Sequence, residues 1–525
     1  MNRISWVGRA AAAALVLAPV QGAAQTFATE SPVLRAIWNV GTRDSQLERL
    51  AQTLLDSIGP RLTGTPQQKL ASDWAIAQYR AWGIPARAEQ YGTWRGWSRG
   101  ITHVDLVEPR VRSLEGTMLA WSPGTGGRPV QAPAVVLPDV QTKEEFEAWL
   151  PQARGKHVLV SFPQPTCRPD DSWARWATEE TLERMLRERA AAAQAWTQRV
   201  ARTGLTTRTL PARLEEAGAV GVIASNWSAG WGVNKVFQAR TTRVPHLDLS
   251  CEDYGLVYRL AANGQGPVLR VAAESQDLGE VPVFNIIAEI RGREKPNEYV
   301  VLSAHFDSWD GAPGATDNGT GTVTMMEAMR ILKEVYPNPK RTILVGHWNG
   351  EEQGLNGSRA FAADNPKVVR GLQVLLNQDN GTGRVAAISM MGFADAEPYF
   401  GRWLARIPTE ITRHITLEAP GTPSSGGSDH ASFLCHGAPA FALSSLNWDY
   451  TNYTWHTNRD TYDKISFDDV RNNAILTAML AYLASEEPTR IPRDRRVVSP
   501  ANARGAPGAW PTCRQPARAS SQSDR

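Results

Sequence analysis

Residues 281–487 repeat one pattern that restricts the fold more than any other feature of the chain. A short, continuously apolar run is followed by a polar loop and then by a stretch with helical periodicity. The apolar runs lie at 299–302, 342–345, 372–376 and 440–443, and a helix is expected at 322–335. Continuous apolar strands separated by helices are typical of a mostly parallel sheet covered on both faces. We therefore predict an α/β fold, in which ligands bind beyond the carboxyl ends of the strands.

Residues that can bind metal ions follow these predicted strands almost immediately. In chain order they are His305, Asp307, Asp317, Glu351, Glu352, Asp379 and His456, with Asp429 and His430 between the last two. The set contains carboxylates and imidazoles but no thiols, which fits Zn²⁺ in a catalytic site. Two zinc ions would be well served by a bridging carboxylate. Asp317 is the best candidate because Gly314 and Gly319 allow the backbone to turn tightly around it.

The pair Glu351-Glu352 indicates hydrolysis. Adjacent side chains in a loop point in different directions, so one carboxylate can bind metal while its neighbour takes a proton from a metal-activated water. Asp307, two residues after His305, is placed to orient that imidazole. Each motif alone has an ordinary explanation as a surface turn or a core hydrogen bond. The arrival of five candidate ligands in order, in loops that follow strands, favours a metal site.

The motifs of this region resemble the co-catalytic zinc aminopeptidase family, and within it the carboxypeptidase Q branch. The resemblance is carried by the runs His305–Asp310, Ala315–Gly319, Glu351–Gly354 and His456-Thr457 with Asp460-Thr461, and by the early turn Ile58–Gly64. It covers roughly residues 30–487. It implies that His305 and Asp379 hold one zinc, that Glu352 and His456 hold the other, and that Asp317 bridges. It also implies Glu351 as general base, Asp307 as the carboxylate behind His305, and a cis peptide bond at Asp317-Asn318.

The oxyanion donor and the role of one histidine near the expected site stay open. Some relatives have a tyrosine near the last histidine that stabilises the oxyanion, but Trp455 directly precedes His456 here, which leaves Tyr450 or Tyr453. His430 is either a wall of the substrate pocket or an ordinary buried histidine. His347, at the end of its strand, is expected to be structural.

The remainder of the chain divides into four segments with different composition. Residues 1–24 read as a secretory signal peptide, and residues 25–127 as the first part of the peptidase domain. Residues 128–275 read as an inserted β-rich module with one long helix at 178–202, which resembles a protease-associated domain. After the catalytic part at 276–487, residues 488–525 are predicted to form a disordered tail.

Composition excludes several classes of function. The net charge is only +3 and the basic residues are scattered, so nucleic-acid binding is not expected. No run after the signal peptide is long and apolar enough to span a membrane, and the chain is expected to be secreted or periplasmic. The four cysteines, Cys167, Cys251, Cys435 and Cys513, form no zinc-finger pattern, and the sequence does not reveal a disulfide pairing or an oligomeric state.

The sequence therefore predicts a secreted zinc exopeptidase that hydrolyses dipeptides or short peptides. Two alternatives remain: a receptor or binding protein that has kept the fold and lost catalysis, and another amide hydrolase or a glutaminyl cyclase. The peptide terminus that is recognised is not evident. Arg359, Arg384 and Arg459 are candidates to bind a substrate carboxylate, although surface positions are expected for each.

Overall fold

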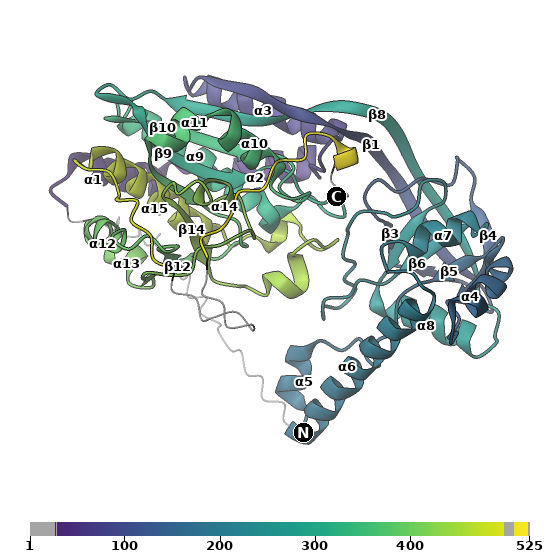
Figure 1. The fold of residues 1–525 in the computed structure, drawn as a ribbon. Helices are drawn as coiled ribbons and strands as arrows, with labels where there is room; N and C mark the ends of the chain where they lie inside the picture. Colours follow the sequence, from purple (N-terminus) through teal and green to yellow (C-terminus); the bar gives the residue numbers. More distant parts are fainter. Residues whose placement is uncertain (1–26, 28, 498–508, 523–525) are drawn as a thin grey trace, which may run out of the picture.

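The computed structural model describes residue 27, residues 29–497 and residues 509–522, and it shows two lobes of unequal size (Figure 1). The larger lobe contains both ends of the described chain, and the smaller lobe contains the middle. The predicted signal peptide lies outside the described residues. Among the helices that are described, none combines the length and the apolar character needed to cross a membrane.

The larger lobe is built on the predicted α/β sheet. Its strands run in the order β13-β12-β14-β11-β9-β10-β8. The inner strands β14, β11, β9 and β10 are parallel, whereas β12 and β8 run antiparallel to their inner neighbours. The sheet is therefore mixed, with the predicted parallel strands at its centre. Their bounds are β9 Lys295–His305, β10 Arg341–Trp348, β11 Leu372–Asn377, β12 Val385–Ser389, β13 Thr416–Glu418 and β14 Ala440–Ser445.

Helices cover both faces of this sheet, as predicted. One layer contains α1 Pro32–Arg43, α2 Leu47–Gln52, α9 Thr320–Val335 and α15 Phe467–Glu486. The other contains α10 Asn356–Asp364, α11 Pro366–Gly371 and α14 Ala431–Leu434, while α3 Pro66–Ala81 and α12 Glu397–Leu404 lie towards the two ends of the sheet. Both α1 and α3 begin with a proline, after a Ser31 or Thr65 cap whose hydroxyl accepts a backbone N–H.

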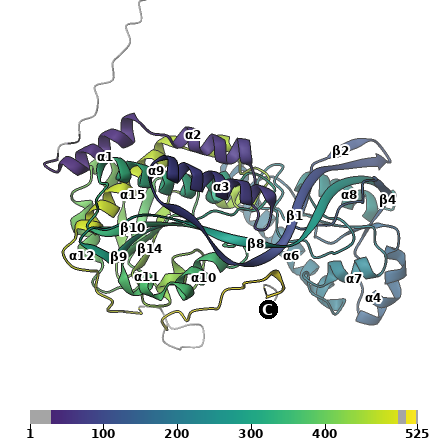
Figure 2. The same ribbon diagram turned by 90° about the horizontal axis from the view of Figure 1, so that it is seen from above.

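Two very long strands join the lobes. β1 (Ala86–Glu108) and β8 (Val268–Ile290) pair antiparallel along almost their whole length and run from the sheet of the larger lobe into the smaller lobe (Figure 2). From the sequence alone, residues 30–92 read as largely helical and residues 93–135 as several short strands. Irregularities in the pairing, such as the shift between Gln90 and Gly92, interrupt the alternation of buried and exposed residues, which is why one strand reads as several.

The smaller lobe is a mixed sheet with helices around it. Its further strands are β2 Arg112–Leu114, β3 Gly116–Met118, β4 Val130–Val136, β5 His157–Leu159, β6 Gly221–Ala224 and β7 His246–Leu249. Its helices are α4 Lys143–Trp149, α5 Asp170–Trp176, α6 Glu179–Arg202, α7 Leu210–Glu216 and α8 Cys251–Ala262. The lobe thus starts before residue 128, with β2 and β3. The helix predicted at 178–202 is α6, which projects with α5 from the body of the lobe (Figure 1).

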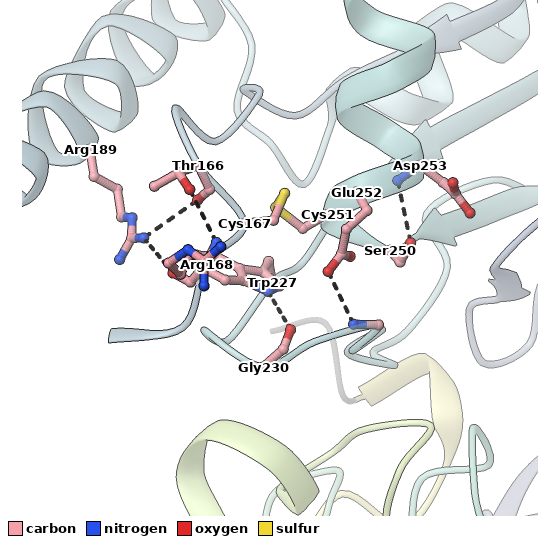
Figure 3. The surroundings of a disulfide bond; sticks show 11 residues. Thr166, Cys167, Arg168, Arg189, Trp227, Gly230, Ser250, Cys251, Glu252 and Asp253 are labelled. Carbon is pink, nitrogen blue, oxygen red and sulfur yellow. Dashed lines mark hydrogen bonds between the residues drawn. A yellow bond between two sulfur atoms is a disulfide. The ribbon is translucent and has the colours of Figure 1, made fainter. Parts of the chain in front are cut away.

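A disulfide ties the projecting helices to the smaller lobe. Cys167, just before α5, is bonded to Cys251 at the start of α8 (Figure 3). Beside it, the guanidinium of Arg189 packs on the ring of Trp227, with 4.9 Å between the guanidinium carbon and the ring centroid. The base of the α5–α6 projection is therefore fixed by one covalent bond and one cation–π contact.

A buried histidine should make the smaller lobe sensitive to acid. Burial lowers the pKa of His157 in β5 to about 4, whereas an unfolded histidine titrates near 6.5. Between these values the unfolded chain binds a proton that the folded chain does not, so stability falls as the pH is lowered from about 6.5 to about 4. At pH 5 this histidine alone should cost about 2 kcal/mol of unfolding free energy.

We therefore expect His157→Phe to reduce the loss of stability between pH 7 and pH 5 by about 2 kcal/mol, as measured by urea denaturation at both pH values. His246→Phe is a second test, because burial lowers the pKa of His246 to about 3. An unchanged loss in both variants would contradict the assignment.

The prediction of a disordered tail is wrong for the described part of residues 488–525. Residues 509–522 run back along the larger lobe towards β1 (Figure 1). Cys513 is disulfide-bonded to Cys435 just after α14, and the indole N–H of Trp510 donates to the carbonyl of Leu434. Composition averages over such a segment, so a few well-spaced anchors in an Arg-, Pro- and Ala-rich background are missed.

Candidate metal centre

The loops at the carboxyl edge of the parallel strands bring the predicted metal ligands together. β9 ends at His305, the loop after β10 carries Glu352, and the loop after β11 carries Asp379. The short turn Ala315–Gly319 before α9 carries Asp317, and the loop after β14 carries His456. All five lie in two groups whose potential ligand atoms are within 4.8 Å of one another: His305, Asp317, Asp379 and Asp317, Glu352, His456.

Asp317 belongs to both groups through different oxygen atoms. Its Oδ1 lies 3.2 Å from Nε2 of His305, which is also 3.0 Å from Oδ1 of Asp379. Its Oδ2 lies 3.4 Å from Nε2 of His456, which is 2.9 Å from Oε2 of Glu352. The peptide bond Asp317-Asn318 is cis. The geometry is that of a carboxylate shared between two three-residue groups.

The donor atoms of these groups fit divalent cations. All five residues are largely buried, and Oδ2 of Asp317 and Oε1 of Glu352 have no hydrogen-bond partner in the described part of the chain. Buried carboxylate oxygens without donors are costly, so they are better explained by metal ligation than by packing alone. Imidazole and carboxylate without thiolate is a donor set that zinc accepts.

Asp307 orients the site in two ways, only one of which the sequence predicts. Nδ1 of His305 lies 2.9 Å from the main-chain carbonyl oxygen of Asp307, whereas the carboxylate is farther away at 3.7 Å. The carboxylate instead accepts the backbone N–H groups of Glu351 (3.2 Å) and Glu352 (3.3 Å). Asp307 thus fixes His305 through its backbone and the Glu-Glu pair through its side chain.

Glu351 lies beside the two groups without belonging to either. Burial raises the pKa of its carboxyl well above the usual range, the charges of Asp379 and Asp429 add to this, and His305 opposes it. Cations bound in the two groups would favour the ionised carboxylate and so act against this rise. A carboxylate in this position can hold or release a proton next to a ligand of the metal groups.

Two buried residues that received no role from the sequence hold the turn of Asp317 in place. The carboxylate of Asp460 accepts the backbone N–H groups of Thr316 (2.8 Å) and Asp317 (2.9 Å). The fully buried Arg61 donates to the carbonyl oxygens of Phe306 (2.7 Å), Pro313 (2.6 Å) and Gly314 (3.1 Å). Both residues stood in the family-like runs, but only the folded chain shows what they contact.

Tyr450, rather than Tyr453, faces the metal groups. Burial, followed by the carboxylates of Asp317, Asp379 and Glu352, raises the pKa of Tyr450 well above its usual value. Its hydroxyl therefore stays protonated and can donate a hydrogen bond to a developing negative charge. The charges near Tyr453 are instead those of Asp171 and Asp449, at the surface.

A cavity of about 470 Å³ opens next to the site. Its lining includes Asp379, Ser428, His430, Met391 and Glu418. His430 is 5% exposed and neither ring nitrogen has a hydrogen-bond partner in the described part of the chain, which favours the pocket-wall interpretation. His347 is bound by Tyr79, whose hydroxyl lies 2.7 Å from Nε2, and is structural as predicted.

The smaller lobe holds the loop that carries His456. The backbone N–H of Val236 donates to the carbonyl of His456 (2.8 Å), and three hydrogen bonds join Asn234 to Asn458. His456 has a left-handed backbone conformation, with φ of 59°, which is uncommon for a residue other than glycine. Its Nδ1 has no hydrogen-bond partner among the described residues, and the ring is packed by Phe237 of the smaller lobe, with 5.2 Å between centroids.

The chain is similar to known peptidases. Residues 285–481 match the model of peptidase family M28. Carboxypeptidase Q of Rattus norvegicus is 24% identical over 89% of this chain and 92% of its own length. Leucine aminopeptidase 1 of Coccidioides posadasii is 34% identical, over 38% of this chain and 55% of its own length.

Solved structures show the same fold. A peptidase M28 precursor from Shewanella amazonensis matches with a TM-score of 0.64 at 23% identity, over 88% of this chain and 98% of that one. A zinc aminopeptidase from Bacillus subtilis matches with a TM-score of 0.52 at 19% identity, over 85% and 96%. All five candidate ligands and Glu351 lie within residues 285–481, the part of the chain that matches the model of peptidase family M28.

Proposed function

We propose that this chain is a secreted exopeptidase that holds two zinc ions and hydrolyses dipeptides or short peptides. The observation that carries the proposal is the division of Asp317 between two complete ligand groups, one oxygen facing His305 and the other facing His456. His305 and Asp379 would hold one ion, Glu352 and His456 the other, and Asp317 would bridge them. When bound, the ions would polarise the carbonyl of a peptide bond and lower the pKa of a water molecule from about 15.7 towards about 7.

The chain's own residues supply the proton transfer. Glu351 is the general base: it takes the proton of the attacking water and passes it to the leaving amine, a role worth roughly 10²–10⁴-fold in rate. Asp307 holds the backbone of Glu351 through a 3.2 Å hydrogen bond, which keeps the base in place. Tyr450 donates to the oxyanion that forms at the carbonyl.

The smaller lobe, which we assign as a protease-associated domain, narrows access to the site. It contacts the loop of His456 directly, through Val236 and Asn234, so a folded protein substrate would meet it before reaching the ligands. Two disulfides, Cys167–Cys251 and Cys435–Cys513, suit an oxidising compartment. The restricted access favours short peptides as substrates. The disulfides favour a location outside the cytoplasm, in the periplasm or the medium.

The proposal is tested with a panel of free, N-blocked and C-blocked dipeptides, assayed with the zinc-loaded protein and after removal of zinc by a chelator. We expect zinc-dependent cleavage of at least one free dipeptide, and the blocked substrates then identify the required terminus. A protein that carries two zinc ions and cleaves no peptide would overturn the proposal. The zinc content of the same protein also distinguishes the proposed peptidase from a glutaminyl cyclase, for which one zinc ion is expected.

A non-catalytic binding protein is the second candidate. It would be expected to have lost ligands or the base, whereas His305, Asp317, Glu352, Asp379, His456 and Glu351 are all present and converge. Enzymatic hydrolysis is therefore the better explanation of the site.

Phe237 should matter for one metal group only. In Phe237→Ala the imidazole of His456 loses a ring that packs against it, while the group of His305 and Asp379 is untouched. Because residues that orient a metal ligand typically contribute 10–100-fold to affinity, we expect the zinc site that contains His456 to lose about that much affinity.

Zinc titration against a competing chelator measures both sites. Trp176→Ala removes an exposed aromatic ring from the same lobe and serves as the control. Equal weakening of both sites, or of neither, would contradict a role of Phe237 in orienting His456.

A further inference from the structure

Lys235 of the smaller lobe reaches the metal-ligand cluster of the larger lobe. It follows β6 and forms an antiparallel bridge with Thr457. Its Nζ lies 4.0 Å from the ring centroid of Trp455, and the same ring stacks on the imidazole of His456 with 3.9 Å between centroids. The charge of Lys235 acts on both His456 and Asp317.

This ammonium is buried without an ion pair. Lys235 is 7% exposed, and within residues 29–497 and 509–522 its polar contact is the carbonyl oxygen of Thr451 at 3.4 Å, with no carboxylate in ion-pair range. The face of Trp455 stabilises the cation in part. An ammonium has three N–H donors, so two remain for a ligand. Burying an ammonium without an ion pair is costly, and Asp317, the carboxylate whose charge acts on Lys235, is itself a candidate metal ligand. An anionic group of a ligand would therefore complete this place.

Three arginines near the site already have partners. Arg459 pairs with Glu115, and Arg384 lies 3.3 Å from Asp469. Arg61 donates to backbone carbonyls, as described above. Arg359 is near Asp429 and Glu351, whose charges act on it, and these two residues belong to neither metal-ligand group. On the side of His456, Lys235 is the cation of the described chain that is available to a ligand.

We infer that Lys235 binds the C-terminal carboxylate of the substrate. The inference rests on the proposed peptidase function and deepens it: preferred substrates are dipeptides, or short peptides cleaved at their last bond, with an unblocked carboxyl group. One residue spans about 3.3–3.6 Å of chain. When the last peptide bond is cleaved, the C-terminal carboxylate is one residue away from that bond. It therefore stays within reach of Lys235, whose ammonium packs on Trp455 beside the candidate ligand His456. A peptide cut at an internal bond would leave the ammonium unpaired.

The test compares alanyl-leucine with alanyl-leucinamide, using the zinc-loaded full chain as wild type, Lys235→Met and Lys235→Arg. Lys143→Met, which removes an exposed lysine of the same lobe, is the control. We expect the wild type to prefer the free acid by about tenfold or more in kcat/KM, because charge-assisted hydrogen bonds are strong. Lys235→Met should lose this preference through a higher KM for the acid, with the amide unchanged, and Lys235→Arg should restore most of it.

Each outcome decides the question. Equal cleavage of acid and amide by the wild type overturns the inference, and so does an equal loss on both substrates in Lys235→Met, which would show that Lys235 only holds the Trp455 loop. Cleavage of neither substrate by the wild type would be a failure of this pair as substrates, and calorimetric binding of leucine against leucinamide then tests Lys235 separately. Stronger binding of leucine that Lys235→Met abolishes supports the inference, and binding that is equal in both proteins overturns it.

Discussion

Glu351→Gln should bind two zinc ions per chain and cleave peptides roughly 10²–10⁴-fold more slowly than the wild type. Glutamine has the size of glutamate but accepts no proton at neutral pH, so the attacking water keeps its proton and the leaving amine receives none. The loss corresponds to about 3–5 kcal/mol of transition-state stabilisation. The loss should appear in kcat, because Glu351 acts in the proton transfer. The metal sites should still form, because Glu351 is outside both ligand groups. Steady-state kinetics on a free dipeptide, with zinc content measured on the same sample, checks both parts.

The neighbouring residue provides the matched control. Glu352→Gln makes the same chemical change one position along the chain, but Oε2 of Glu352 lies 2.9 Å from Nε2 of His456 within a ligand group. We expect this variant to lose zinc as well as activity. If Glu351→Gln also lost zinc, or kept its activity, the two roles would have to be exchanged or abandoned.

Asp317→Asn should remove both zinc ions, because this one side chain serves both groups. An amide has one acceptor oxygen where the carboxylate has two, so it cannot bridge. By contrast, His456→Ala should lose one ion and keep the other, since the group of His305, Asp317 and Asp379 remains. We expect peptide cleavage to be undetectable in Asp317→Asn. Metal analysis after dialysis should give about two, one and no zinc ions per chain for wild type, His456→Ala and Asp317→Asn, as the two-ion arrangement requires.

Stability provides a second readout that does not depend on catalysis. Zinc that binds only the folded chain stabilises it by about 2.7 kcal/mol at a hundredfold excess over Kd. This gain should be present in the wild type and absent in Asp317→Asn, as measured by urea denaturation with and without a chelator. An Asp317→Asn protein that still gained stability from zinc would show that the ion binds elsewhere.

Local pattern and chain order account for what the sequence predicts well. Soon after an apolar run comes each of three candidate ligands, His305, Glu352 and Asp379. A parallel sheet brings such positions to one edge, independent of the length and packing of the connecting helices. The alternation of strands and helices likewise gives the α/β fold. His456 is farther from its strand, and its place in the ligand set came from the resemblance rather than from the pattern.

Contacts between the lobes could not be predicted in this way. Phe237 and Lys235 lie in a loop of the smaller lobe with no metal-binding or catalytic motif, and their role depends on how that loop packs against residues more than two hundred positions later. The carboxylate of Asp307 was expected behind His305 but contacts the Glu-Glu pair instead. With a spacing of two residues, either the main-chain carbonyl or the carboxylate of Asp307 could reach His305. The sequence does not reveal which of them does.

The long ribbon of β1 and β8 has a consequence for any attempt to shorten this protein. Arg95 and Glu280 are already paired across the ribbon, so a tight turn between them could replace the intervening chain and leave the catalytic sheet with its edge strands. Such a trimmed chain would lack Val236 and Phe237, so the loop of His456 would lose a backbone hydrogen bond and one of the aromatic rings that pack on the imidazole, leaving Trp455 and Trp309. The smaller lobe therefore does not only cover the site but also supports the loop of His456. A minimal version that keeps both metal sites would need a new support for His456, built from the larger lobe alone.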